Sequence, residues 1–252
     1  MKKKIKQKIR RIRTKILSSL FPLDLKTIAQ LAHTDKWGGH RYAQHYDTHF
    51  RPFRNKKLTL LEIGVGGYEN PKYGGESLRM WKAYFPKAMI YAIDIYEKKA
   101  HEENRIKIFQ GSQADADFLK LVCKKTGPLD IIVDDGSHIN SHVLITFKTL
   151  FPFLKEGGIY VIEDVQTSYW SQMGGSNLGG DGENFNNPNT TMGFFKGLTD
   201  GLNHMEFLKP DYQPSYFEKN IVSISFYHNL IFVYKGSNDE KSNLVENGAF
   251  LQ

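Results

Sequence analysis

The length and composition of the chain fit a soluble α/β protein and exclude several other classes. A sequence of 252 residues, 24% charged and 40% hydrophobic, is long enough to bury one sizeable core with extensions. No apolar run approaches the roughly 20 residues of a membrane-spanning helix, and the N-terminus lacks a signal-peptide hydrophobic region, so we expect a cytoplasmic protein. The single cysteine, Cys123, excludes a disulfide framework and a multi-cysteine zinc site.

The net charge of +7 is a property of the N-terminal segment. Nine of the 34 Lys and Arg residues lie within residues 1–15, which contain no acid, and the other 25 are balanced by 27 Asp and Glu residues, a net of −2. The body of the chain therefore offers no basic face for a nucleic acid, and it contains no nucleic-acid-binding motif. We expect no nucleic-acid partner.

Residues 1–20 repeat an apolar residue every three or four positions, with Lys and Arg between them: Ile5, Ile9, Ile12, Ile16 and Leu20. This spacing predicts a basic amphipathic helix. Such a helix either rests on the anionic inner face of a membrane or packs on the domain or on another subunit of a homo-oligomer. The sequence leaves both alternatives open.

Histidines and aromatic residues are crowded between residues 34 and 50. Side chains of this kind combine an apolar face with a polar end, which suits the wall of a binding pocket. The alternative is a partly buried helix whose Tyr and His tips reach solvent, and it is the better account of any one residue. His40 and Tyr46 are the candidates here for contact with a substrate.

A glycine turn follows the first predicted strand, residues 58–63. The sequence Glu62-Ile63-Gly64-Val65-Gly66-Gly67-Tyr68 places an acid two positions before the first glycine, and Glu69 stands where a dinucleotide-binding loop has its third glycine. The pattern therefore disfavours a pyrophosphate. A carboxylate beside bare backbone favours a ligand that carries an ammonium group.

The second predicted strand, residues 89–94, ends in Asp94. In nucleotide-binding sheets an acid at this place accepts hydrogen bonds from ribose hydroxyls, so we assign Asp94 to a ribose. Its distance from the glycine turn is longer than usual, and an insert at residues 70–75 accounts for the excess. A helix is expected over residues 77–85 and a third strand over residues 105–110. Gln113, in the polar stretch that follows, is a candidate contact for a purine.

Two further predicted strands end in pairs of acids. Residues 131–133 are followed by Asp134-Asp135-Gly136-Ser137-His138, and residues 158–162 by Glu163-Asp164. A helix over residues 139–154 makes this a strand-helix-strand unit, so both carboxyl ends emerge at one edge of the sheet. Four acids and a histidine would then meet, and an oxygen-rich set suits magnesium. Solvated helix caps are the alternative, which is weaker for two acid pairs than for one acid.

The last part of the chain contains a glycine-rich loop and a predicted hairpin. Residues 174–182 are so rich in glycine that we expect a mobile lid or a disordered loop. A helix is expected over residues 191–204, and residues 221–226 and 230–234 should form an antiparallel hairpin. The expected domains are the helix of residues 1–20, a main domain of residues 21–236 and a polar tail of residues 237–252.

Five motifs between Thr34 and Tyr234 carry a family resemblance: Asp35-Lys36-Trp37-Gly38, Glu62 to Tyr68, Ser77-Leu78-Arg79-Met80-Trp81, Asp134 to His138, and Val161 to Asp164 with Gln166 to Trp170 after it. They resemble the class I S-adenosylmethionine-dependent methyltransferases, and more narrowly the metal-dependent sugar O-methyltransferases of macrolide biosynthesis, of the mycinamicin VI and demethylmacrocin type. The resemblance implies an α/β fold with a Rossmann-like, doubly wound, mostly parallel seven-stranded sheet and a C-terminal antiparallel hairpin. A basic helix stands where those enzymes carry an additional N-terminal domain, so the resemblance fixes neither a macrolide acceptor nor the subunit arrangement.

The same resemblance implies roles for individual residues. Asp135, Glu163 and Asp164 would bind Mg²⁺, and His138 would be the general base. S-adenosylmethionine would be held by the glycine turn and by polar residues at the strand ends: Glu62, Gly64, Gly66, Tyr68, Ser77, Asp94, Gln113 and Asp134. Gln166 and Tyr169 join His40 and Tyr46 as candidate contacts for the acceptor.

These roles imply an O-methyltransferase that uses S-adenosylmethionine and Mg²⁺ and acts on a sugar hydroxyl of a glycoside or glycan precursor. One alternative is a methyltransferase for a non-sugar hydroxyl or an amine, which chelator sensitivity and acceptor screening would separate. Another is a membrane-associated binding module that has lost catalysis, which would bind the cofactor without turnover.

Overall fold

The computed structural model describes residues 23–251, so the helix predicted over residues 1–20 lies outside the described residues. The main sheet has seven strands in the order β3-β2-β1-β4-β5-β9-β8. The chain divides into two compact units, with the division between Ser112 and Gln113. Within residues 23–251, no helix is long and apolar enough to cross a membrane.

The first unit contains three parallel strands, in which β2 pairs with both β1 and β3. Their bounds are Thr59–Ile63 for β1, Met89–Asp94 for β2 and Ile106–Gln110 for β3. The helices of this unit are α2 (Leu25–Ala32), α3 (Ala43–Phe50), η1 (Arg51–Phe53), α4 (Glu76–Tyr84) and η2 (Lys99–His101). The predicted strand-turn-helix order is therefore present.

Aromatic side chains fill the core between α3 and α4. Tyr46, Phe50 and Trp81 are completely buried. The Trp81 ring centroid lies 4.9 Å from that of Tyr46 and 5.7 Å from that of Phe50, both in edge-on contact. The Tyr84 hydroxyl donates a hydrogen bond of 2.7 Å to the buried Asp47, which joins the same two helices.

The second unit contains four strands: β4 (Leu129–Asp134), β5 (Leu154–Glu163), β8 (Ile221–Tyr227) and β9 (Leu230–Lys235). β4 and β5 are parallel, whereas β9 is antiparallel to both β5 and β8. The sheet is therefore mostly parallel with a C-terminal antiparallel pair, which confirms the predicted fold class and the predicted hairpin.

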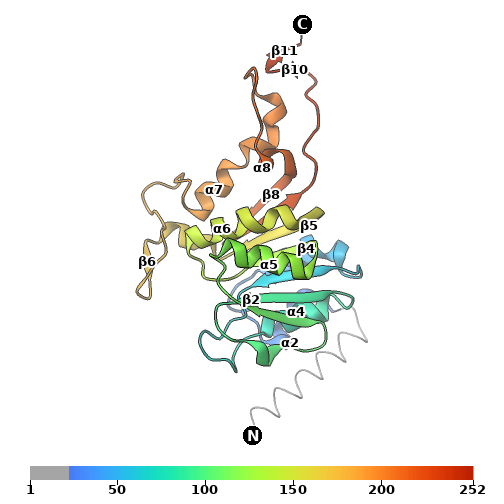
Figure 1. Ribbon diagram of the computed structural model, residues 1–252, viewed down its shortest axis with the longest axis vertical. Helices are drawn as coiled ribbons and strands as arrows, with labels where there is room; N and C mark the ends of the chain where they lie inside the picture. The colour runs from blue at the N-terminus through green and yellow to red at the C-terminus, as the bar shows by residue number, and fades with distance from the viewer. Residues whose placement is uncertain (1–22, 252) are drawn as a thin grey trace. The chain divides into compact units, whose positions relative to one another are not determined.

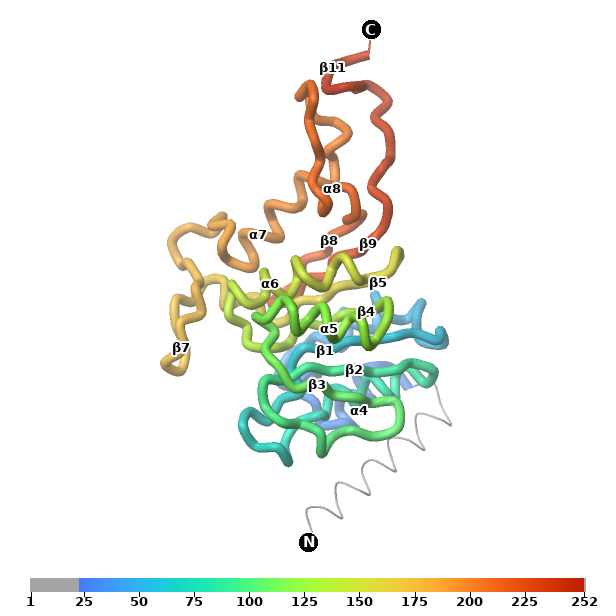
Figure 2. Tube along the Cα trace, viewed as in Figure 1, coloured from blue at the N-terminus to red at the C-terminus, as the bar shows by residue number. Residues whose placement is uncertain are grey.

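Two helices, α5 (Ala116–Thr126) and α6 (Asn140–Leu150), lie side by side on one face of β4 and β5 (Figures 1 and 2). Asp115 caps the start of α5, because its side chain accepts hydrogen bonds from two backbone amides of the first turn. α6 ends at Leu150, earlier than predicted, because Pro152 lacks the amide that would continue the helix. The short η3 (Phe151–Phe153) follows, and Leu154 already belongs to β5.

Two other segments differ from their predictions. The helix expected over residues 191–204 is divided into α7 (Thr191–Gly197) and η5 (Asp200–Glu206). The glycine-rich segment forms a small hairpin of β6 (Gln172–Met173) and β7 (Ser176–Asn177), with Gly174 and Gly175 at positive φ in the turn. The side chain of Ser215 caps α8 (Tyr216–Asn220).

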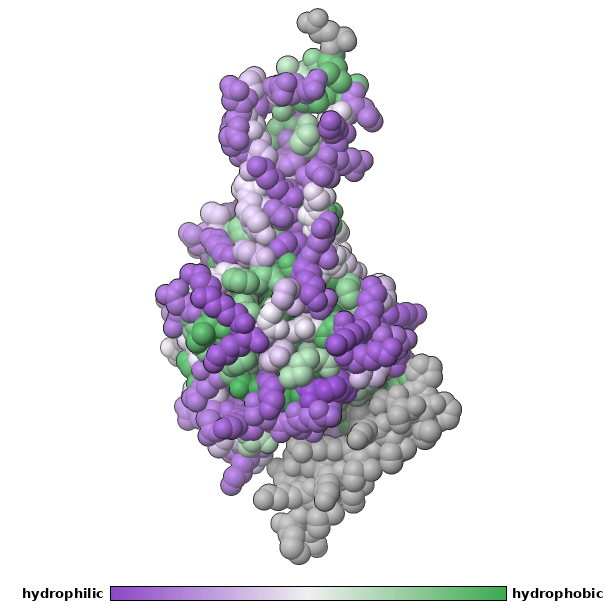
Figure 3. Space-filling view, turned by 45° about the vertical axis from the view of Figure 1, so that its right-hand side comes forward, coloured by the Kyte–Doolittle hydropathy of each residue, from purple (hydrophilic) through white to green (hydrophobic). Residues whose placement is uncertain are grey.

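The chain ends in a short hairpin where the sequence predicts a polar tail. β10 (Val245–Glu246) pairs with β11 (Ala249–Phe250). Leu244, Phe250 and Leu251 are exposed there. Figure 3 shows apolar residues gathered at this end of the second unit, within a mostly polar surface.

Candidate active site

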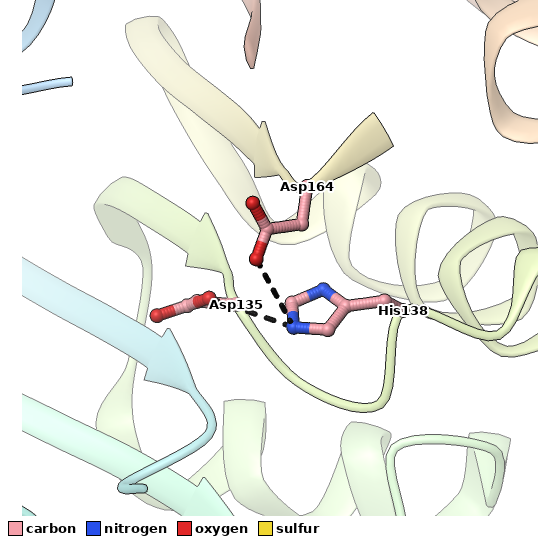
Figure 4. A group of neighbouring side chains, drawn as sticks. All are labelled: Asp135, His138 and Asp164. Atoms are coloured by element: carbon pink, nitrogen blue, oxygen red, sulfur yellow. Dashed lines mark ion pairs between the residues drawn. The ribbon is translucent and has the colours of Figure 1, made fainter. Parts of the chain in front are cut away.

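The residues that directly follow β4 and β5 bring three side chains together. Asp135 follows β4 and Asp164 follows β5, and the parallel pairing of these strands places both acids at one edge of the sheet. His138 Nε2 lies 3.8 Å from Asp135 Oδ1 and 3.6 Å from Asp164 Oδ2 (Figure 4). One ligand atom from each of these half-buried residues lies within 4.8 Å of the other two.

The backbone of this cluster adopts an uncommon conformation at two positions. His138 has a φ of 56° and Asp164 a φ of 53°, in the left-handed region that residues other than glycine seldom occupy. Asp164 directly follows β5, and His138 lies in the turn after β4. The positive φ of each residue changes the direction of the chain at the place where the two side chains meet. Conformations of this kind persist at binding and catalytic sites, where the surrounding structure holds them.

Asp134 belongs to a separate buried network rather than to this cluster. Its Oδ1 accepts a hydrogen bond of 3.2 Å from Gln113 Nε2, and its Oδ2 accepts one of 3.3 Å from the Tyr160 hydroxyl. Burial raises the pKa of Asp134 to about 7, and the neighbouring charge of Asp135 adds to the rise, against the hydrogen bonds from Gln113 and Tyr160. The carboxyl of Asp134 is thus partly protonated near neutral pH.

Gln113 links this network to the turn that carries the cluster. Its Oε1 accepts a hydrogen bond of 2.7 Å from the amide of Ser137, and its Nε2 also donates to Thr146 Oγ1 of α6 at 3.0 Å. Gln113 and Asp134 were both predicted to contact the cofactor. In the structure they are buried and bonded to each other, and Gln113 fixes the turn between Asp135 and His138.

Glu163, predicted as a third metal ligand, is the last residue of β5 and pairs with Leu230 of β9. Its side chain is only 3% exposed. Among residues 23–251, the group whose ligand atoms lie close together consists of Asp135, His138 and Asp164 and does not include Glu163. His138, which was predicted to be the general base, therefore takes the third place in this group, where Glu163 was expected.

The glycine turn of the first unit is held by Asp94. Gly64 and Gly66 have φ values of 93° and 77°, which only glycine adopts readily. The Asp94 Oδ2 accepts a hydrogen bond from the amide of Val65, and its Oδ1 accepts one from the amide of Tyr96, both at 2.9 Å. Asp94 therefore lies directly beside the turn, at the end of β2, and its contact with a ribose stays a prediction.

Glu62 is completely buried at the end of β1. Its Oε1 lies 3.7 Å from the ammonium of Lys36, and its Oε2 accepts a hydrogen bond of 3.0 Å from Ser77 Oγ. Ser77, also predicted to contact the cofactor, thus bonds to Glu62. Tyr68 has a positive φ of 46° and a side chain that is 86% exposed.

The four candidates for acceptor contact lie in different environments. Tyr46 is a core residue of the first unit, and the ring of His40 stacks on that of Tyr42 at 4.6 Å. In the second unit, Gln166 and Tyr169 belong to η4 (Val165–Tyr169), which begins directly after Asp164. Tyr169 is 39% exposed, and the buried Oε1 of Gln166 accepts no hydrogen bond from any described residue.

Three residues with structural importance around these sites were missed by sequence analysis. They are the buried Lys36 beside Glu62, the buried Lys98, and Asn140 at the start of α6. Asn140 Nδ2 donates to the carbonyls of Thr167 and Leu178, and its Oδ1 accepts from the amide of Thr191. An asparagine at the first position of the helix, two residues after His138, is a polar residue that a buried site can use, but its partners lie too far along the chain to be read from the sequence.

The chain is similar to several O-methyltransferases, although no protein-family model matches it. It is 46% identical over 219 residues to the mycinamicin VI 2''-O-methyltransferase of Micromonospora griseorubida, covering 86% of this chain and 54% of the relative. It is 43% identical over 219 residues to the demethylmacrocin O-methyltransferase of Streptomyces fradiae, with the same coverage of 86% and 54%. A rhamnosyl tetracenomycin-C 2'-O-methyltransferase of Streptomyces olivaceus is 44% identical over 206 residues, covering 81% of this chain and 53% of the relative.

The structure of the MycE methyltransferase of the mycinamycin biosynthetic pathway, in complex with Mg and SAH, matches with a TM-score of 0.82 at 45% identity. The match covers 87% of this chain and 56% of that one. These comparisons confirm the resemblance and the fold expected from the motifs. The chain spans about half the length of the curated relatives that it matches.

Proposed function

We propose that this chain is an S-adenosylmethionine- and Mg²⁺-dependent O-methyltransferase that acts on a sugar hydroxyl of a glycoside or glycan precursor, through a domain of residues 21–236. The observation that carries the proposal is the cluster of Asp135, His138 and Asp164 at the ends of β4 and β5. It occurs in a fold that matches a methyltransferase bound to Mg and SAH, and the relatives are named for methyl transfer to sugar-bearing molecules.

The donor atoms of the cluster fit a divalent cation. Two carboxylates this close repel each other, and their charge is balanced when a cation lies between them. Carboxylate oxygens suit Mg²⁺, and we assign Asp135 and Asp164 to it, with Glu163 as the third acid. A magnesium ion held there would make the hydroxyl groups of a bound sugar more acidic.

His138 is assigned as the general base. Its Nε2 would accept the proton of the sugar hydroxyl as that oxygen forms a bond to the methyl carbon and the carbon–sulfur bond of the cofactor breaks. Asp164 and Asp135 flank this nitrogen and would stabilise the imidazolium that results. A sulfonium releases a neutral thioether, which is a good leaving group, so the remaining task of the protein is to position the reactants.

In the first unit the cofactor is assigned to the glycine turn and to polar residues near it: Glu62, Gly64, Gly66, Tyr68, Ser77 and Asp94. In the second unit it is assigned to Gln113 and Asp134. Each Asp94 oxygen accepts one backbone amide and keeps a second lone pair, which leaves room for ribose hydroxyls. The buried positions of Gln113 and Asp134 support an indirect role, in which they hold the turn that follows β4.

For the acceptor, Gln166 and Tyr169 are the assigned contacts. The buried Oε1 of Gln166, two residues after Asp164, suits a hydroxyl donor. The exposed Tyr169 ring packs edge-on against Phe185 at 5.6 Å and offers an apolar surface at the end of η4. His40 is a weaker assignment, and the core position of Tyr46 favours packing over substrate contact. A non-sugar hydroxyl or an amine is the alternative acceptor.

Residues 1–20 are assigned, from their sequence, to peripheral contact with the anionic inner face of a membrane. Packing on a second copy of the chain in a homo-oligomer is the alternative. Sedimentation with anionic vesicles, compared between the full chain and a variant without residues 2–15, decides between them. Loss of vesicle binding in the shortened chain supports membrane contact, and a change of oligomeric state supports packing.

The experiment that tests the main proposal is calorimetric titration of S-adenosylmethionine into the protein, with Mg²⁺ and again with EDTA. We expect binding under both conditions, because the assigned cofactor residues are separate from the metal ligands. Absence of binding in both would overturn the proposal. Binding without turnover on a broad panel of acceptors would favour a binding module instead.

A further inference from the structure

Lys98, just after β2, is a buried cation whose partners all lie in one loop. Its side chain is 1% exposed. Its Nζ donates hydrogen bonds to the carbonyls of Tyr68 at 2.6 Å, Asn70 at 2.9 Å and Tyr73 at 3.3 Å. An ammonium group has three N–H donors, so this loop uses all of them. The partners are main-chain groups, so Lys98 acts on the path of the backbone rather than on particular side chains.

The loop that Lys98 contacts follows an unusual path. Tyr68 has a φ of 46° although it is not glycine, and its exposed ring cannot hold that conformation by packing. The two arms of the loop touch through their backbones: a Cβ on Gly67 would lie 2.3 Å from the Tyr73 carbonyl, and one on Gly74 would lie 2.3 Å from Gly66 O. The two arms of the loop lie so close together that their carbonyl groups point into a small space, where the Lys98 ammonium donates a hydrogen bond to three of them.

Arg79 completes the set of cations around the loop. Its Nη1 donates to Gly75 O at 2.7 Å and its Nη2 to Gly74 O at 3.2 Å. Lys98 therefore fixes the middle of the loop and Arg79 fixes its end. A buried charge is costly unless it is compensated, and an apolar side chain of the same length would fill this space at lower cost. We therefore attribute the presence of a buried lysine at position 98 to the loop conformation that its hydrogen bonds stabilise.

The orientation of the carbonyls has a consequence for the amides of the same peptides. In a trans peptide the N–H points opposite to the C=O, so the amides of Glu69 and Gly74 are directed away from Lys98. Across residues 23–251, neither amide donates to a protein acceptor. Gly74 is a buried residue, and a buried N–H is costly without an acceptor, which a ligand can supply.

We propose that Lys98 is a positioning residue that holds the loop of residues 64–75 in the form that receives the cofactor, with the Gly74 amide offered to the carboxylate of the ligand's amino-acid part. The inference rests on the function proposed above, because it takes the ligand of this loop to be S-adenosylmethionine. Lys98 itself touches neither ligand nor reacting atoms in this account.

The test compares Lys98→Met with Lys99→Met, a matched change of the neighbouring lysine, which is exposed. For each folded variant, S-adenosylmethionine is titrated by calorimetry, and hydrogen exchange is measured for the amides of residues 67–75. Lys98→Met should bind the cofactor at least about tenfold more weakly and exchange these amides faster, while β1 and β2 keep wild-type exchange. Lys99→Met should match the wild type in both measurements.

A Lys98→Met protein with wild-type affinity and wild-type loop exchange would overturn the inference. If Lys98→Met does not fold, Lys98→Arg decides. It keeps the charge but replaces a compact, buried ammonium with a larger planar group whose N–H donors point in different directions. Faster loop exchange in folded Lys98→Arg supports the inference and unchanged exchange overturns it. A wild-type protein that binds no S-adenosylmethionine overturns the proposed function instead, and the loop exchange still tests the action of Lys98 on the backbone.

Discussion

The Asp164 carboxylate and the His138 imidazole, carried by different strand ends, lie with Oδ2 and Nε2 3.6 Å apart. Asp135 Oδ1 approaches the same nitrogen at 3.8 Å. Two carboxylates and an imidazole are therefore brought within reach of one another, so groups that can hold a metal ion and a group that can accept a proton share one small volume.

Replacing Asp164 should weaken the metal site. Asp164→Asn keeps the shape of the side chain but removes its charge, so we expect Mg²⁺ affinity to fall by at least about tenfold. Titration of Mg²⁺, or of Mn²⁺ followed by electron paramagnetic resonance, measures this. The matched control is Asp130→Asn on β4, because Asp130 pairs with Lys155 and lies outside the cluster. Equal metal affinity in the two variants would remove Asp164 from the metal site.

Replacing His138 separates a base from a ligand. If His138 is the general base, His138→Ala should lower kcat by about 10²–10⁴-fold and leave Mg²⁺ affinity nearly unchanged. The comparison is His228→Ala, which changes an exposed histidine in the turn between β8 and β9. A large loss of Mg²⁺ affinity in His138→Ala would instead assign the imidazole to the metal.

The unsatisfied oxygen of Gln166 predicts a specific effect on the acceptor. Gln166→Leu removes that oxygen at similar size, so we expect the KM for the acceptor to rise by about tenfold, with cofactor affinity unchanged. Steady-state kinetics with the acceptor varied measures the effect, and the exposed Gln213→Leu serves as the control. A KM equal to that of the control would mean that Gln166 does not meet the acceptor.

Asn140 should matter for stability through the backbone groups that it satisfies. Asn140→Ala leaves the Thr167 and Leu178 carbonyls without that donor and the Thr191 amide without that acceptor, all close to a fully buried side chain. We expect the free energy of unfolding to fall by about 3 kcal/mol in urea titrations. Asn189→Ala, an exposed position, should change it by less than about 0.5 kcal/mol. A similar small change at Asn140 would contradict this account.

Asp47 predicts a dependence of stability on pH. Burial alone would raise the pKa of Asp47, but hydrogen bonds from Arg51 and Tyr84 and the charges of Arg51 and Arg54 outweigh it and hold the pKa below its usual value. A depressed pKa in the folded state stabilises the protein above the unfolded value of about 3.9, and this contribution is lost as pH falls through the folded pKa. The free energy of unfolding should therefore fall less between pH 6 and about pH 3 in Asp47→Asn than in the wild type. Equal falls would show that Asp47 is not linked to stability.

The sequence predicted the strands around the site well for a physical reason. A parallel strand with helices on both faces must be apolar along its whole length, and residues 131–133 and 158–162 carry that pattern directly before their acids. Parallel pairing then places Asp135 and Asp164 at one edge, as the structure shows. The end of α6 was predicted less well: the expected helix of residues 139–154 runs through Pro152, whereas α6 ends at Leu150.

The sequence could not tell which residues of a motif face the site. Asp134 and Asp135 are adjacent acids, but one joins Gln113 and Tyr160 in the interior and the other joins His138. Lys98 and Lys99 are likewise adjacent, and one is buried while the other is exposed. Composition and periodicity do not distinguish such neighbours, because the difference depends on partners brought together only by the tertiary fold.

The most direct test of the central claim is methyl transfer from labelled S-adenosylmethionine to a panel of deoxysugar and rhamnosyl glycosides, measured with Mg²⁺ and with excess EDTA. The account predicts a methylated sugar product with Mg²⁺, loss of product with EDTA, and recovery when Mg²⁺ is restored. Transfer that proceeds equally in EDTA would contradict the role of Asp135 and Asp164 as metal ligands. A methylated amine with no methylated sugar would contradict the assigned acceptor class.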